Sequence, residues 1–156
     1  MAFGALSLKG RALRYLAQRE HSRAELERKL ARFAEDGPDD SAAQQIARAL
    51  DELTARGFLS EARVAESVLN GQGQRFGARR LKQTMQAKGL DAALVAATLQ
   101  QARGTELERA RQVWQRKFGT PAQDVAERAR QMRFMAARGF EGEVIRRVVQ
   151  GIADDD

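Results

Sequence analysis

The sequence has no cysteine, one histidine and two prolines among 156 residues, and only 6% of its residues are aromatic. Without cysteine there is no disulfide framework and no thiolate metal site, and one histidine cannot supply a zinc cluster. No apolar run approaches the roughly 20 residues that a membrane span needs. Residues 1–9 lack the charged and then apolar stretches of a secretory signal. We therefore expect a soluble, cytoplasmic protein without membrane contact.

The residues that are abundant favour helix almost throughout. Alanine, leucine, arginine, glutamate and glutamine dominate, while Pro38 and Pro121 both fall between expected helices. Capping boxes at Ser22, Ser41 and Thr105, and a proline start at Pro121, would begin four of these helices. Glycines at fixed intervals would end them. The signals predict nine helices, over residues 8–20, 23–35, 42–56, 61–70, 77–88, 92–103, 106–118, 122–138 and 142–150.

A short phrase occurs four times, each time where one helix should stop and the next begin. The copies start at Leu16, Leu53, Met85 and Met135, so they lie 37, 32 and 50 residues apart. A basic residue comes three positions on, followed usually by a glycine (Gly57, Gly89, Gly139) and a bulky residue (Phe58, Leu90, Phe140), while His21 takes the bulky place in the first copy. We expect each bulky residue to pack in the corner between two helices. Repetition at this period is typical of tandem helical units.

The predicted fold class is therefore all-α, with three tandem three-helix repeats in an elongated array that can curve. We expect a first module in residues 1–36, whose third helix is shared across 42–56, and central modules in 41–103. A C-terminal three-helix module would occupy 104–151, and 152–156 would be an acidic tail. The joint at 103–105 would separate the last two modules. No coiled-coil heptad demands a partner, so a monomer is expected.

Positive charge is concentrated in one stretch of the chain. Five of the six excess charges lie in residues 70–103, which carry one acid, Asp91. On a helix over 77–88, Arg79 and Lys82 lie three residues apart, and Arg75 just ahead of the helix lies four residues before Arg79. These side chains would point away from the apolar Leu81 and Met85. A concentrated field of one sign attracts an anionic partner. The predicted partner- or DNA-binding stripe consists of Arg75, Arg79, Arg80, Lys82 and Lys88.

Motifs for chemistry are missing, so we predict no catalytic, cofactor-binding or metal-binding residue and no enzymatic activity. The glycines at 71, 73 and 77 are not followed by the Gly-Lys-Ser/Thr of a phosphate loop. His21 is expected to be a packed corner residue, and Tyr15 and Trp114 to be core residues. The acids Glu25, Glu27, Glu106 and Glu108 are expected to be helix caps and members of surface pairs.

Four segments resemble the RecX family. They are ALRYLAQREHSRAELERKL from Ala12, LDELTARGFLSEARVAESVL from Leu50, RFGARRLKQTMQAKGL from Arg75 and RQMRFMAARGFEGEVIRRVVQG from Arg130. The resemblance covers nearly the whole chain in the right order. Two departures, Ser60 and Val64, stand where similar sequences commonly place Asp and Phe. Serine still caps a helix and valine still packs, so these departures affect local packing.

The resemblance implies a regulator of the RecA recombinase that lodges along the RecA–DNA filament. It would lower filament extension, ATP hydrolysis, strand exchange and co-protease activity, and so act in DNA recombination, DNA repair and the SOS response. Protein contacts would dominate over a weak or filament-dependent DNA contact. Two alternatives stay open from the residues themselves. One is a helix-turn-helix-like module that binds nucleic acid without a recombinase, and the other is a helical scaffold for acidic proteins.

Overall fold

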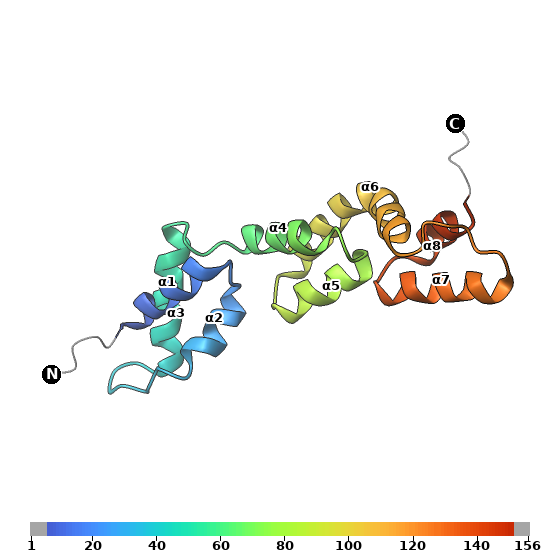
Figure 1. Cartoon of the computed structure of the whole chain (residues 1–156). Helices are drawn as coiled ribbons and strands as arrows, with labels where there is room; N and C mark the ends of the chain where they lie inside the picture. The colour runs from blue at the N-terminus through green and yellow to red at the C-terminus, as the bar shows by residue number, and fades with distance from the viewer. Residues whose placement is uncertain (1–5, 152–156) are drawn as a thin grey trace. The chain divides into compact units, whose positions relative to one another are not determined.

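The structure is a computed structural model that describes residues 6–151. Within these residues it contains helices and no strands, which confirms the all-α fold class (Figure 1). The helices are α1 (Leu8–Gln18), α2 (Arg23–Leu30), α3 (Ala42–Ala55), α4 (Glu61–Gln72), α5 (Ala78–Ala87), α6 (Ala92–Lys117), α7 (Val125–Ala137) and α8 (Gly142–Val149). None of the helices in the described range is long and apolar enough to cross a membrane.

Several helices begin where the sequence predicts. Ser22 with Glu25 and Ser41 with Gln44 form capping boxes at the starts of α2 and α3. In each box the serine oxygen accepts a hydrogen bond from an amide in the first turn, which otherwise has no partner within the helix. Asp91 caps α6 in the same way, since Ala93 N donates to its carboxylate over 3.1 Å.

The prediction of nine helices is wrong in one place, because a single helix, α6, spans residues 92–117. Gly104 lies inside α6, so it is neither a stop nor a joint, and Thr105 does not cap a new helix. A glycine in a helix costs about 1 kcal/mol relative to alanine. Here a buried stripe runs past it and outweighs that cost. The stripe contains Ala102, Glu106, Ala110 and Val113.

Other boundary predictions also fail. Pro121 lies ahead of α7, which begins at Val125 with Asp124 as its capping residue. Gly37 and Gly71 do not end helices, because α2 stops at Leu30 and α4 continues to Gln72. Proline and glycine at these sites therefore mark the connections only approximately.

The chain divides into two compact units. The described part of unit 1 comprises residues 6–67 and 88–90, and that of unit 2 comprises 68–87 and 91–151. In unit 1, α1, α2 and α3 pack together, as the blue and teal helices of Figure 1 show. Their buried cluster consists of Ala12, Leu26, Leu30, Ile46, Leu50, Leu53 and Leu59. Tyr15 packs against this cluster, as predicted.

In unit 2, α6 is the central element. It packs against α5, α7 and α8, and α7 also packs against α8 (Figure 1). One buried cluster of this unit consists of Ala110, Val113, Met135, Phe140, Ile145, Val148 and Val149, and Trp114 packs against it as predicted. Leu81 and Met85 are each 1% exposed, so the apolar side of α5 faces the interior as expected.

The repeated corners form largely as predicted. Gly57, Gly89 and Gly139 all adopt positive φ, the conformation that glycine takes without strain. His21, Leu90 and Phe140 are buried.

The prediction for Phe58 is wrong. Its side chain is 49% exposed, and Leu59 fills the corner instead with 3% exposure. The amides of Phe58 and Leu59 both donate to Leu53 O, at 2.9 and 3.2 Å. The turn in this copy is therefore one residue longer before the chain enters the core.

Candidate functional site

The predicted basic stripe lies around α5 and is divided between two sides of this helix. Successive residues of an α-helix point about 100° apart, so Arg79 and Arg80 face different directions. Arg79, Lys82, Gln83 and Gln86 recur at spacings of three and four and form one side. Arg75 is not on the helix, because α5 begins at Ala78 and Arg75 belongs to the loop before it. The prediction placed Arg75 just ahead of the helix, but it counted this residue on the same side as Arg79 and Lys82.

The first side of α5 borders a pocket of about 460 Å³, which we call the basic pocket. It is lined by Ala78, Arg79, Lys82, Gln83 and Gln86, by Leu99 and Arg103 of α6, and by Glu141. Three cations therefore share the pocket with one carboxylate. Arginine forks and glutamine amides are donors that suit a carboxylate or phosphate oxygen. The pocket can hold an anionic group.

The loop before α5, residues 73–77, is fixed by side chains of α6. Arg109 donates to Gly73 O at 2.6 Å and to Phe76 O at 2.9 Å. Arg116 donates to Gln74 O at 3.0 Å. Burial lowers the pKa of Arg109, an effect that the charge of Glu106 opposes. These bonds hold the loop, and with it the start of α5, in one position.

Glu106 joins two helix starts in unit 2. Its carboxylate is 3% exposed and accepts hydrogen bonds from the amides of Ala78, at 3.2 Å, and Glu141, at 3.4 Å. The amides at helix starts lack partners within the helix and carry partial positive charge, so a buried carboxylate suits them. Glu106 was predicted to be a helix cap or a member of a surface pair. It does bond helix-start amides, but it is buried, and the helices it serves are α5 and α8. On the continuous helix α6, a spacing of four residues places Glu106 on the same buried side as Ala102 and Ala110. This pattern was missed in the sequence because a helix end was predicted at Gly104.

The second side of α5 faces Phe76 and the corner at 138–140. The guanidinium carbons of Arg75, Arg80 and Arg138 lie 5.4, 4.8 and 5.6 Å from the centre of the Phe76 ring. We call these four residues the Phe76 cluster. Arg138 comes from the fourth copy of the repeated phrase, and no local signal in the sequence connects it with Phe76.

The backbone brings these residues together at two glycines. Gly77 N donates to Arg138 O at 2.9 Å, and Arg79 N donates to Gly139 O at 3.0 Å. A Cβ atom on Gly77 would lie 2.5 Å from the Phe140 Cα, and one on Gly139 would lie 2.6 Å from the Arg80 Cβ. Contact this close requires glycine on both segments. The first turn of α5 is thus packed directly on the corner between α7 and α8.

Lys88 does not join either group. Its ammonium lies 3.1 Å from Glu25 Oε1 in unit 1, and its carbonyl accepts a hydrogen bond from Ser22 Oγ at 2.5 Å. Burial raises the pKa of Glu25, but hydrogen bonds from Arg19, the Ser22 amide and Lys88 outweigh it and lower the pKa to about 2. Lys88 is therefore tied into a partly buried ion pair, unlike the exposed Arg79, Arg80 and Lys82.

His21 is a packed residue, as predicted. It is 1% exposed, its Nδ1 lies 3.0 Å from Arg19 O, and Lys29 Nζ donates to its Nε2 over 2.9 Å. The ring is therefore neutral with its proton on Nδ1, and burial lowers the pKa of His21. In the described part of the chain no three His, Cys, Asp or Glu side chains are grouped so that they could hold a metal ion.

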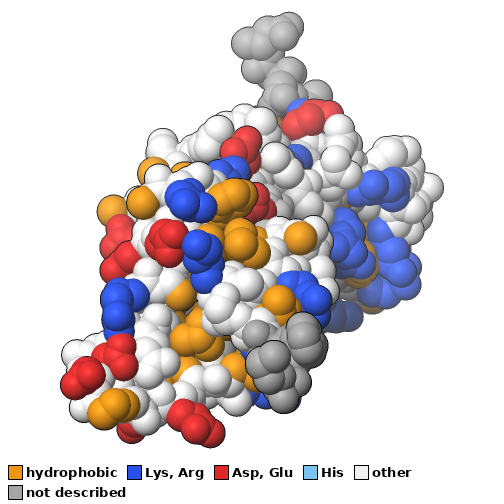
Figure 2. All heavy atoms as spheres, turned by 90° about the vertical axis from the view of Figure 1, so that its left-hand side faces the viewer, with side chains coloured by type: hydrophobic (Ala, Val, Ile, Leu, Met, Phe, Trp, Pro, Cys, Tyr) orange, Lys and Arg blue, Asp and Glu red, His pale blue; other side chains and the backbone are white. Residues whose placement is uncertain are grey.

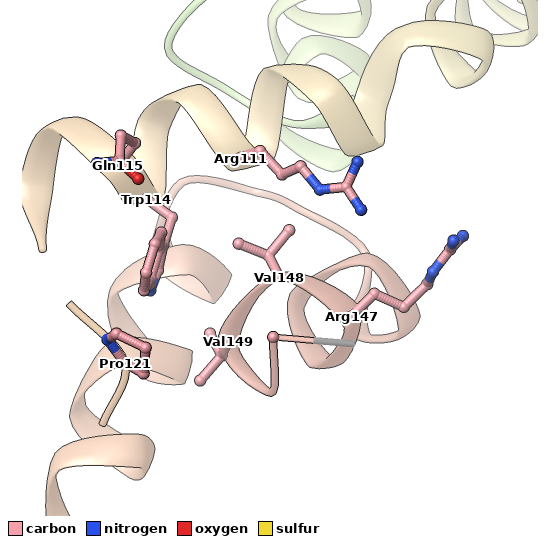
Figure 3. A pocket seen from close by; sticks show the side chains of 8 residues that line it. Arg111, Trp114, Gln115, Pro121, Arg147, Val148 and Val149 are labelled. Carbon is pink, nitrogen blue, oxygen red and sulfur yellow. The ribbon is translucent and has the colours of Figure 1, made fainter. Parts of the chain in front are cut away.

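A further pocket of about 350 Å³ lies in unit 2 between α6, α8 and the connection to α7. Figure 3 shows Val148 and Val149 between Trp114 and Pro121 on one side and the outstretched Arg111 and Arg147 on the other. Trp114 Nε1 donates to Gln131 Oε1 at 2.9 Å, so this indole is oriented by the core. Figure 2 shows one face of the molecule, with acids, bases and small apolar patches interspersed and a group of basic side chains near its right-hand edge.

Comparisons with known proteins identify the family. Models of the first, second and third three-helix domains of RecX match residues 9–33, 60–99 and 105–149. The chain is similar to the regulatory protein RecX of Leptothrix cholodnii, with 51% identity over 97% of this chain and 92% of that protein. It is also similar to the regulatory protein RecX of Ralstonia nicotianae, with 45% identity over 94% of this chain and 88% of that protein.

A solved structure has the same fold. The crystal structure of RecX from Lactobacillus salivarius matches with a TM-score of 0.74 and 17% identity, over 93% of this chain and 94% of that one. The second and third domain matches end and begin within α6, so this helix contributes to both three-helix domains. From these matches over nearly its full length, the chain belongs to the RecX family.

Proposed function

We propose that this protein is a negative regulator of RecA that binds the RecA–DNA filament. The observation that carries the proposal is the match, over nearly the whole chain, to relatives named regulatory protein RecX. The proposed effects are reduced filament extension, ATP hydrolysis, strand exchange and co-protease activity, with roles in DNA recombination, DNA repair and the SOS response. The protein would act in the cytoplasm, as a monomer, without catalysing a reaction.

We propose the basic pocket as the main contact with the recombinase. Arg79, Lys82 and Arg103 present three cations there against the single carboxylate of Glu141. An acidic side chain of the partner would be held by a fork of donors and by the surrounding positive charge. The amides of Gln83 and Gln86 can both donate and accept hydrogen bonds, whereas lysine and arginine only donate, so the pocket favours a partner group of defined shape over any anion nearby.

The first test is the rate of ATP hydrolysis by RecA of the same organism on single-stranded DNA, with this protein added in substoichiometric amounts. Inhibition at ratios too low to coat the DNA is the expected result. Hydrolysis that stays unchanged until the protein covers the DNA would refute regulation of the filament. DNA binding by the protein alone is measured in parallel.

A pair of variants tests the pocket. Arg79→Glu with Lys82→Glu reverses two charges in the basic pocket, and we expect at least a tenfold loss of inhibition, since even one charge-assisted contact contributes about 1.5–3 kcal/mol. Arg128→Glu with Arg133→Glu makes the same charge change at exposed positions of α7 and serves as the control. Circular dichroism confirms folding of both. Equal inhibition by the two double variants would exclude the basic pocket as the contact.

A further inference from the structure

The 73–77 loop carries an unusual concentration of arginine. Arg109 and Arg116 bond its carbonyl groups, and Arg75, Arg80 and Arg138 surround the ring of Phe76. Five guanidinium groups thus gather at five residues. Within residues 6–151 no carboxylate is bonded to this loop, and the nearby Glu106 carboxylate is engaged by the amides of Ala78 and Glu141. The local field is strongly positive.

The three guanidiniums of the Phe76 cluster have an aromatic ring as their common neighbour. Within residues 6–151, neither Arg75, Arg80 nor Arg138 forms an ion pair with a carboxylate. Each is within 6 Å of the ring centroid, close enough for a cation–π contact. Arg138 also lies 5.0 Å from the centre of the Phe134 ring. These aromatic rings contact the cations but do not neutralise them. A cluster of three like charges gains free energy when an anion binds among them.

The spacing of the cluster fits a chain of charges better than a single carboxylate. Two guanidiniums at 5.4 and 5.6 Å from the same ring centre lie at most about 11 Å apart. A duplex strand carries one phosphate about every 3.4 Å of helix axis, and the phosphates of a flexible single strand lie farther apart than this, so two or three of them fall within that distance. One carboxylate would neutralise one arginine and leave two. A phosphodiester backbone can reach all three.

Duplex recognition through α5 does not fit the packing. A recognition helix presents its first residues to the major groove. Here the first turn of α5 is packed on the 138–140 corner, through the Gly77 and Arg79 amides. The ring of Phe76 and its arginines instead lie beside a loop, where a flexible strand can follow them.

From this geometry we propose that the Phe76 cluster binds the phosphodiester backbone of single-stranded nucleic acid. Arg75, Arg80 and Arg138 contact neighbouring phosphates, and the Phe76 ring packs beside all three guanidinium groups. The contact is independent of base sequence, since it involves phosphates alone. The inference extends the proposed function, which gives the DNA contact no location, and it assigns DNA and recombinase to different sides of α5.

The test measures binding of a fluorescein-labelled oligothymidylate by anisotropy across a range of salt concentrations, without RecA. Arg80→Gln with Arg138→Gln is compared with Arg128→Gln with Arg133→Gln, the matched exposed pair on α7. For single strands the slope of log affinity against log salt falls by about 0.7 for each lost phosphate contact, so the cluster variant should lose about 1.4. The control should lose little. Arg75→Gln, in the exposed part of the loop, should lose about 0.7.

The outcomes separate this inference from the proposed function. Equal slopes for the cluster and control variants would overturn the inference. Normal oligonucleotide binding with lost inhibition of RecA would also overturn it, since the cluster would then contact protein. Tighter binding to a duplex, lost in the same variants, would overturn the choice of single strands. Weaker oligonucleotide binding by the cluster variants would support the inference even if the wild-type protein failed to inhibit RecA.

Discussion

Glu25 is the residue whose charge should contribute most to the stability of unit 1. Its carboxylate is 9% exposed and accepts hydrogen bonds from Arg19 at 2.7 Å, from the Ser22 amide at 3.1 Å and from Lys88 at 3.1 Å. These bonds outweigh burial and bring the pKa of Glu25 from 4.5 to about 2. The folded protein therefore stabilises the ionised form.

The shift sets both the size and the pH range of the effect. A shift from 4.5 to about 2 corresponds to roughly 3 kcal/mol of stabilisation at neutral pH, because one pKa unit is about 1.4 kcal/mol. The Arg19 side chain is 48% exposed, so solvent screens its part and about 2 kcal/mol is a better expectation. Since the folded pKa lies below the unfolded one, the contribution is complete above about pH 4.5 and disappears as the pH falls toward 2.

Glu25→Gln keeps an oxygen for the Ser22 amide but removes the charge. Urea denaturation followed by circular dichroism should show a loss of about 2 kcal/mol near pH 7 and a much smaller loss near pH 3. Glu27→Gln is the control, because Glu27 is 51% exposed and its pair with Arg23 should contribute less than about 0.5 kcal/mol. If Glu25→Gln cost no more than Glu27→Gln, or cost the same at both pH values, the reasoning would be refuted.

Three further predictions concern the separate units, one for unit 1 and two for unit 2. Burial lowers the pKa of His21 below 6.5, so the unfolded chain takes up the proton first and unit 1 should lose stability as the pH falls below about 6.5. His21→Leu should make the melting temperature depend less on pH between about pH 8 and pH 5. An unchanged slope of melting temperature against pH would contradict this. Gly139→Ala should cost at least about 2 kcal/mol, since its φ is +86° and the new Cβ would lie 2.6 Å from the Arg80 Cβ. Gly104→Ala, with no side-chain neighbour within 4 Å inside α6, should instead raise stability by about 0.8–1 kcal/mol, and a lower melting temperature would contradict that expectation.

Local signals were sufficient to predict most helices and corners. Ser22 and Glu25 act within three residues of each other, and the positive φ of Gly89 and Gly139 depends on the turn that contains them. The buried side of α5 also follows from the four-residue spacing of Leu81 and Met85. In each case the residues that decide the structure are neighbours in the sequence, so the pattern is readable there.

Tertiary packing decided the cases where prediction failed. Gly104 carries the local signal of a helix stop, but the buried stripe on both sides of it keeps α6 continuous. Phe58 occupies the expected corner position, yet Leu59 enters the core. Three residues of the predicted stripe, Arg79, Arg80 and Lys82, lie on α5. Their division into two groups depends on Arg103, Glu141 and Arg138, which join them through the fold. No spacing in the sequence reveals such contacts.

The repeated phrase acquires a physical meaning from two of its copies. Lys88 O accepts a hydrogen bond from Ser22 Oγ, and Arg138 O accepts one from Gly77 N. In both cases the donor is the residue directly before a helix, α2 for Ser22 and α5 for Gly77. The glycine that follows sits against that same region, since a Cβ on Gly89 would lie 2.7 Å from the Ala24 Cβ.

The basic residue of the phrase therefore contributes to the contact between the corner and the next helix start through its backbone carbonyl, which any residue could provide. Its side chain is left to vary in role between copies. In unit 1 the Lys88 ammonium is bound by Glu25 and stabilises the joint. In unit 2 the Arg138 guanidinium lies at Phe76 beside two other cations without a carboxylate in the described residues. The same carbonyl position of the phrase thus accepts a hydrogen bond in both units, beside a structural ion pair in one and beside the proposed cationic binding cluster in the other.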